Sequence, residues 1–136
     1  MTVITITPGN VDVIDNNAIA ISREYGEGLD AGLFVAVNSS GLVVKADNTD
    51  EVLSRVIGMT LETKLMNEFG LILTAGPVAV GTSAITSAQA YMLSDTLGKM
   101  GANADITIGN YVVYLGQAET DDDFFLSQKT FGFVKD

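Results

Sequence analysis

Short apolar stretches, each ended by Gly, Asn or Pro, run along the whole chain and constrain its fold more than any other feature. Residues 2–7 (TVITIT) and 18–22 (AIAIS) alternate apolar with polar or small side chains, and residues 111–119 (YVVYLGQAE) form the strongest stretch. Such runs are typical of strands with one buried face. No amphipathic pattern of ten or more residues indicates a helix. The sequence therefore predicts an all-β fold, a small antiparallel barrel or sandwich.

Turn-forming residues predict where the individual strands end. Gly58 is expected to mark a bulge or a close approach of two backbones, and Pro77 to separate two short strands. Residues 64–70 (KLMNEFG) are expected to form a short helix or a loop tip. Further strands are expected at residues 11–15, 34–37, 42–46, 56–63, 71–76, 78–81, 91–93, 99–103, 124–128 and 131–134.

Two parts of the chain resemble each other. Residues 31–43 (AGLFVAVNSSGLV) and 88–100 (AQAYMLSDTLGKM) both run from small residues through an aromatic and a polar turn to a glycine. Two readings are open: hairpins of similar composition, or one hairpin-plus-strand unit duplicated at residues 31–63 and 88–120. We favour duplication, because the order of matching residues continues past the hairpin. The later matches are Ala46–Asp47 with Ala104–Asp105, and Ile57–Gly58 with Leu115–Gly116.

This repeat suggests how the chain is organised. Residues 31–136 are expected to form a single β domain built from the two related halves. Residues 1–30 are expected to add N-terminal strands, an extended arm packed on the same domain or on a neighbouring subunit.

The composition raises the question of what covers the apolar surface. Hydrophobic residues make up 47% of the chain and the mean hydropathy is +0.32. No uninterrupted apolar run approaches the roughly 18 residues of a membrane span. Either the core is unusually dense, or part of the surface is buried against another chain. We favour burial against another chain.

Charge and missing residue types narrow the function classes. The net charge of −10 disfavours direct binding of nucleic acid, whose phosphates require Lys and Arg. The absence of His and Cys excludes Ser-His-Asp and Cys-His catalysis and most transition-metal sites. The N-terminus lacks the basic and apolar regions of a signal peptide. We therefore expect a protein that binds rather than catalyses, without cofactor, metal, nucleic acid or membrane as a partner.

An ordered set of residues over roughly positions 30–128 resembles the small head decoration (cement) proteins of tailed bacteriophages. No single motif within the set is specific, and the weight lies in the order of its members. In the first half they are Ala31, Gly32, Val35, Gly41, Val43, Ala46, Asp47, Asn48, Thr49, Arg55, Val56, Ile57 and Gly58. In the second half they are Thr86, Ala88, Ala90, Tyr91, Leu93, Ser94, Gly98, Ala104, Asp105, Gly109, Asn110, Tyr111, Val112, Val113, Leu115, Gly116, Ala118, Phe124, Phe125 and Leu126.

The resemblance implies a mainly β protein on the outer capsid surface of a virion, made in the host cytoplasm. Its partners would be the major capsid protein and two further copies of itself in a homotrimer. It would stabilise the expanded head without catalysis. The alternative is a tail-associated or fibre-associated structural or receptor-binding module of a virion.

Three groups of residues are considered as candidate binding sites. The first is a partner interface in the N-terminal segment, although a strand here could equally pair within its own sheet. Asp121, Asp122 and Asp123 could bind a cation, but a solvated hairpin tip is the favoured interpretation. The aromatic residues are expected mainly in the core. The predicted interface residues are Val3, Ile4, Ile6, Val11 and Val13.

Overall fold

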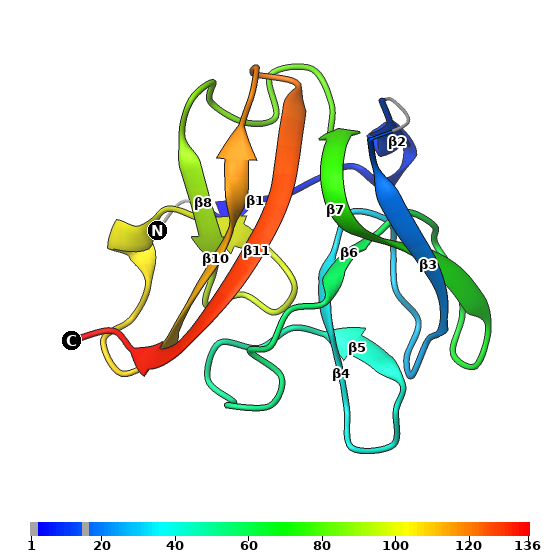
Figure 1. Ribbon diagram of the computed structural model, residues 1–136, viewed down its shortest axis with the longest axis horizontal. Helices are drawn as coiled ribbons and strands as arrows, with labels where there is room; N and C mark the ends of the chain where they lie inside the picture. The colour runs from blue at the N-terminus through cyan, green and yellow to red at the C-terminus, as the bar shows by residue number, and fades with distance from the viewer. Residues whose placement is uncertain (1–2, 15–16) are drawn as a thin grey trace.

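The fold is taken from a computed structural model, which describes residues 3–14 and 17–136 (Figure 1). Apart from two short 3-10 turns, η1 (Pro8–Asn10) and η2 (Asn103–Asp105), the regular elements in this part of the chain are strands. The strands are β1 (Val3–Ile4), β2 (Asp12–Val13), β3 (Ile19–Glu24), β4 (Phe34–Val37), β5 (Val43–Lys45), β6 (Gly58–Thr60), β7 (Phe69–Ala79), β8 (Ala90–Leu93), β9 (Met100–Gly101), β10 (Tyr111–Ala118) and β11 (Asp123–Val134).

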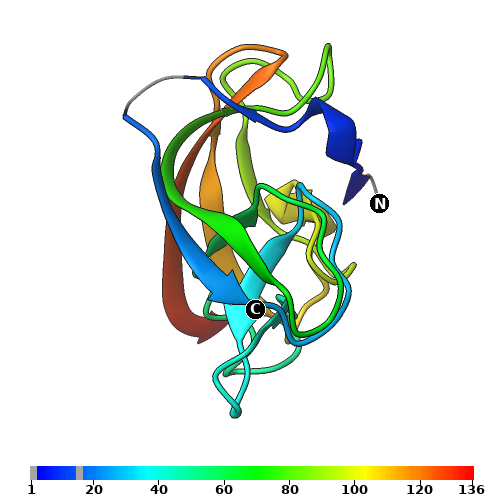
Figure 2. The same ribbon diagram turned by 90° about the vertical axis from the view of Figure 1, so that its right-hand side faces the viewer.

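The strands form one antiparallel sheet that curls into about half of a barrel (Figures 1 and 2). Its order is β1-β9-β8-β10-β11-β7-β6-β4-β5, with β2 and β3 also paired to β7. The long, bent β7 joins the two parts of the sheet. Its first part pairs with β3 and β6, and its last four residues pair with β11 and partly with β2. The predicted mainly β class is confirmed.

The core fills the concave side of the curled sheet. Phe124 lies at its centre, with its ring edge-to-face to Phe34 (centroids 6.1 Å apart) and Tyr91 (6.3 Å). A smaller cluster forms around the fully buried Tyr25, between β3, β4, β5 and β7. Burial of these large side chains supplies the main favourable free energy of folding. The strand period places some alternating apolar residues in this core, but not all of them, since Ile19 in β3 is exposed.

Two pairs of short strands expected from the sequence are each one long strand. Pro77 lies within β7, at a point where the ladder with β3 has ended at Ala75 and the ladder with β2 has not begun. Its missing N–H therefore interrupts no ladder on that side, while β11 pairs with it on the other. Gly132 has φ +77° and lies within β11, which continues to Val134. The expected breaks at residues 129–130 and at Pro77 are therefore wrong.

Of residues 64–70, residues 65–68 form a loop tip rather than a short helix, and residues 69 and 70 already belong to β7. The Glu68 backbone N–H donates to the Leu65 carbonyl (3.1 Å), and the Glu68 carboxylate accepts the Leu65 N–H (2.7 Å). Asn67 has φ +70°, which closes the turn.

The two similar parts of the sequence have the same strand pairing. In residues 31–63, β4 pairs with both β5 and β6, and in residues 88–120, β8 pairs with both β9 and β10. The turn glycines Gly41 (φ +80°) and Gly98 (φ +72°) also share a conformation. The match is incomplete, because Ala46 is buried whereas Ala104 is exposed. The shared pairing supports the predicted duplication, which stays a prediction.

The described N-terminal strands lie on the same domain as the rest of the chain. β1 pairs with β9 at one edge of the sheet, while β2 and β3 both pair with β7. The two ends of the N-terminal region thus contact opposite parts of the half-barrel.

Candidate interaction surface

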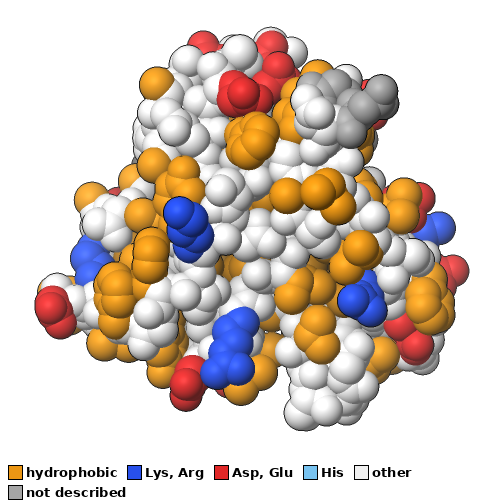
Figure 3. All heavy atoms as spheres, viewed as in Figure 1, with side chains coloured by type: hydrophobic (Ala, Val, Ile, Leu, Met, Phe, Trp, Pro, Cys, Tyr) orange, Lys and Arg blue, Asp and Glu red, His pale blue; other side chains and the backbone are white. Residues whose placement is uncertain are grey.

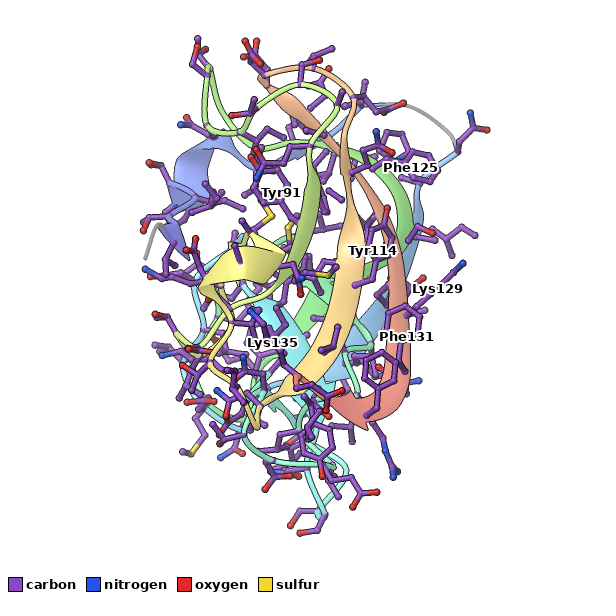
Figure 4. All side chains as sticks on the ribbon, turned by 90° about the vertical axis from the view of Figure 1, so that its left-hand side faces the viewer. Tyr91, Tyr114, Phe125, Lys129, Phe131 and Lys135 are labelled. Atoms are coloured by element: carbon purple, nitrogen blue, oxygen red, sulfur yellow. The ribbon has the colours of Figure 1, made fainter. Side chains whose placement is uncertain are left out.

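The outer side of the β10–β11 hairpin carries exposed aromatic side chains. In β11, Phe124 and Leu126 point into the core and are fully buried, so the residues between and after them point outward. Figure 4 shows Phe125, Lys129 and Phe131 on this outer side. Tyr114 of β10 lies opposite Lys129 in the ladder. We call the outward-facing set Tyr114, Phe125, Ser127, Lys129, Phe131 and Phe133 the β11 face.

The far end of the β11 face is a stacked aromatic pair. The rings of Phe131 and Phe133 lie 5.4 Å apart at 22°, and these side chains are 49% and 55% exposed. Val134 beside them is 40% exposed. A single exposed apolar residue is ordinary, but such a cluster marks a surface that a partner can cover.

The same part of β11 has an open edge. Its pairing with β7 ends at Leu126, opposite Gly76, so residues 127–134 pair with β10 alone among the described strands. The Gln128 side-chain amide spans the gap where β11 and β7 diverge. It donates to the carbonyls of Ile57 (3.0 Å) and Thr74 (3.1 Å). An open edge of this length leaves backbone N–H and C=O groups for another strand.

The charge of this segment differs from that of the chain. Residues 124–135 include no Asp or Glu and two Lys, although the whole chain has a net charge of −10. The Lys135 ammonium donates to the carbonyls of Asn103 and Ile106 (both 2.8 Å), so it is engaged within the fold. Figure 3 shows apolar and basic side chains across this side of the molecule, with acidic ones mostly near its outline. Lys129 therefore supplies the exposed cation of the β11 face.

An open depression lies at the other end of the β11 face, beside the acidic turn. It measures about 570 Å³, and its lining includes both aromatic and polar side chains. Gln117 in its wall is fixed by a hydrogen bond from its amide to the Ala88 carbonyl (3.1 Å). The depression can hold an apolar side chain of a partner beside polar groups. Its lining residues are Ala88, Tyr114, Gln117, Ala118, Glu119, Phe125 and Ser127.

The predicted N-terminal interface residues do not lie together on the surface. Ile4, Ile6 and Val11 pack against the core of their own chain, where Ile6 and Val11 sit over Gly32. Val3 is half-buried in β1, paired with Gly101. Val13 is 40% exposed and stays available for a partner. Val13 is thus the exposed member of the predicted set, and the other four members are partly buried.

The acidic run 121–123 holds a neighbouring loop in place. The Asp121 carboxylate accepts the Ser87 N–H (2.8 Å), and the Asp122 carboxylate accepts the Ser83 N–H (2.8 Å). Both acids thus fix the loop between β7 and β8. The described residues contain no group of three or more Asp or Glu side chains arranged to hold a metal ion.

Asp95 is the centre of a second polar cluster. Its carboxylate accepts hydrogen bonds from the amides of Asn48 (2.8 Å) and Asn110 (3.0 Å) and from the backbone and hydroxyl of Thr107. Burial alone would raise the pKa of Asp95, but the hydrogen bonds from Thr107, Asn48 and Asn110 outweigh it and lower the pKa to about 2. With its oxygens satisfied, Asp95 is a structural anion that joins three loops.

Among the residues that the structure describes, Tyr25 is the other group whose pKa is strongly shifted. Burial, and to a lesser extent the nearby Glu62 carboxylate, raises the pKa of Tyr25 to about 12. Its hydroxyl donates to the Glu62 carbonyl (2.7 Å). The phenol is therefore neutral at physiological pH and serves the smaller core.

The expectation that aromatic residues lie mainly in the core is wrong for several phenylalanines. Phe34 and Phe124 are buried, whereas Phe69, Phe125, Phe131 and Phe133 are exposed. Because side chains alternate along a strand, one of Phe124 and Phe125 must face outward. The sequence alone does not say which of the two does. The available signal was the acid-free, aromatic composition of residues 124–135.

Comparison with known proteins gives no family for this chain. No protein-family model matches it, and no curated protein matches its sequence. No helix among the described residues is long and apolar enough to span a membrane.

Proposed function

We propose that this chain is a structural virion protein that binds the outer surface of a phage capsid lattice and stabilises the expanded head. It works by binding, without catalysis, and its partners are the major capsid protein and copies of itself in a homotrimer. Its place is the outer capsid surface. The proposal joins the sequence resemblance to cement proteins with the surface properties of the fold.

One observation carries the proposal: the extent of apolar surface left uncovered by the chain itself. Among the described residues, fourteen large apolar side chains are well exposed. They include Phe125, Phe131 and Phe133 on the β11 face, and Phe69 and Leu71 on β7. Some of them cluster, as Phe131 and Phe133 do, and apolar clusters of this kind are covered when the subunits of an assembly associate.

A lattice also explains how modest contacts would be sufficient. A cement protein attaches at many symmetry-related sites, and each attached trimer engages several of them at once. Linked weak contacts then give high overall affinity through effective concentration. The open depression at Phe125 is a suitable place for such a contact, because it combines an aromatic wall with polar groups.

The test is co-sedimentation of the purified protein with expanded, empty phage shells. We expect the protein to sediment with shells in a saturable manner, and Phe125→Ser to lower its affinity about tenfold or more. Val52→Ser is the matched control, since Val52 is also an exposed apolar residue but lies on the turn after β5. A protein that stays in the supernatant at all concentrations would overturn the proposal. Binding to purified tails instead would support the tail or fibre alternative.

A further inference from the structure

We infer that copies of this chain associate head to tail, with residues 11–14 of one copy laid along the open edge of β11 in the next. The occupant of the edge is thus a second copy of the same chain. The inference deepens the proposed function. It rests on that function for the number of copies in a ring, but not for the contact itself.

The receiving edge has a defined chemistry. Residues 127–134 offer unpaired backbone groups on one side of β11, bordered by the stacked rings of Phe131 and Phe133. Lys129 adds one exposed cation in a stretch without acidic residues. A strand that combines apolar side chains with a carboxylate is the complement of this edge.

Residues 11–14 (VDVI) have that composition, and residues 12–14 are exposed, while Val11 packs against the core of its own chain. Val13 and Ile14 are 40% and 44% exposed, and Asp12 is exposed beside them. β2 pairs with β7 on one side and with no other described strand, so its second edge is open. β2 therefore has an open edge with acidic and apolar side chains, and β11 has an open edge with basic and aromatic side chains.

The spacing of the side chains allows these edges to match. Along a strand, residues two apart lie on one face, which places Asp12 with Ile14 and Lys129 with Phe131. A parallel register then brings the carboxylate beside the ammonium group and the isoleucine beside the phenylalanine. The exposed ion pair would contribute little to the strength of the contact, but it would select the register and the partner.

The positions of the two edges suit a ring rather than a closed pair. Figure 1 shows β2 and the C-terminal end of β11 at opposite sides of the molecule. Two different surfaces that bind each other make a heterologous contact, which closes into a ring when the rotation between copies permits. In such a ring the open edge of β2 and the open edge of β11 are both covered, so neither is left as a template for uncontrolled strand pairing.

The test is the solution mass of the full chain, measured by light scattering over a concentration series without shells. We expect a trimer of roughly three times 14.3 kDa. We expect Lys129→Glu and Asp12→Lys each to weaken association at least tenfold, and the double variant with both changes to restore it. Phe131→Ser should weaken association without any change of charge.

Arg23→Glu is the control for Lys129→Glu, because it makes the same charge change at an exposed arginine on β3. It should leave the mass unchanged, and urea unfolding of each variant at low concentration should confirm a folded monomer.

Three results would each overturn the inference: a wild-type chain that is monomeric, single charge-reversal variants that associate as the wild type does, or a double variant that does not regain association. A trimer that does not bind shells would overturn the proposed function but not this inference. A monomer that binds shells would overturn this inference but not the proposed function. Binding of a capsid-protein strand at the same edge would appear as a monomer whose shell binding is lost in Lys129→Glu.

Discussion

Two glycines mark the points where neighbouring strands approach most closely. A Cβ atom at Gly58 would collide with the Leu73 carbonyl oxygen, and one at Gly116 with the Phe125 carbonyl oxygen. The two glycines occupy matching positions, each in the third strand of its unit where that strand meets the next one. The close approach predicted at Gly58 is confirmed, and its cause is the contact of β6 with β7.

At this scale we expect Gly58→Ala to destabilise the fold strongly. The methyl group would meet backbone atoms, which cannot rotate away as a side chain can, so the cost should be about 1–3 kcal/mol or more. Gly28→Ala is the matched control, because nothing lies within 4 Å of a Cβ at Gly28. Urea denaturation followed by circular dichroism measures both. Equal midpoints for the two variants would contradict the assigned role of Gly58.

β11 changes its role along its length. Its first residues are held between β10 and β7, and its later residues have β10 as their one partner among the strands that the structure describes. Gln128 stands at the point of change, where its amide donates to the carbonyl of Ile57, just before β6, and to that of Thr74 in β7. The side chain of Gln128 therefore links β11 to the neighbouring strands at the point where the open edge begins.

We expect Gln128→Ala to destabilise the place where β11 and β7 diverge. Two partly buried carbonyls would lose their donor, at a cost of about 1–2 kcal/mol in unfolding free energy. Hydrogen–deuterium exchange should show faster exchange in β6 and in the first part of β7, with little change in β8. Gln117→Ala removes an exposed amide with one hydrogen bond and should have a much smaller effect. Unchanged exchange around Ile57 and Thr74 would mean that Gln128 does not stabilise the place where β11 and β7 diverge.

The two halves of the molecule are joined by polar contacts as well as by the shared core. The Phe34 N–H donates to the Gly98 carbonyl (2.8 Å), and the Gly98 N–H donates to the Ala46 carbonyl (2.9 Å). The Asp95 cluster adds a charged contact, since Asn48 comes from the first half and Thr107 from the second. The relative placement of the halves therefore depends in part on one ionised carboxylate.

The stability of the whole molecule should accordingly fall in acid. The folded-state pKa of Asp95, about 2, lies below the ordinary value of 3.8. Its charged form therefore stabilises the fold above pH 3.8, and this contribution is lost as the pH falls towards 2. We expect Asp95→Asn to be less stable than the wild type at pH 7 and to lose less stability between pH 4 and pH 2. Asp136→Asn, at the exposed C-terminus, is the control, and identical pH profiles for wild type and Asp95→Asn would refute the assignment.

Much of the fold could be predicted because strand period and turn residues act locally. The strand at residues 34–37 followed from a short apolar run that a polar turn ends, and the turn glycines followed from the conformations that glycine tolerates. Strand continuity could not be predicted in the same way. Pro77 usually ends a strand, and only the gap between the β3 and β2 ladders makes it harmless within β7.

The candidate surface was harder to foresee than the fold. The N-terminal segment was chosen for its apolar alternation, but Ile4 and Ile6 use that property to pack on their own core. Phe131 and Phe133 were expected inside, yet they border an edge that no other described strand covers. Apolar character favours burial of a side chain, but it does not show which part of the fold covers that side chain or whether any part does.

The sequence by itself determined the all-β class, the turns at Gly41 and Gly98 and the exclusion of histidine and cysteine chemistry, because these follow from residue types and short-range spacing. Only the tertiary structure decided which strands pair, where β11 leaves β7 and which apolar side chains remain outside. Those properties depend on contacts between residues far apart in the chain, such as Gln128 with Ile57 and Phe124 with Phe34. A strand edge becomes open only when every other strand has taken its place in the sheet.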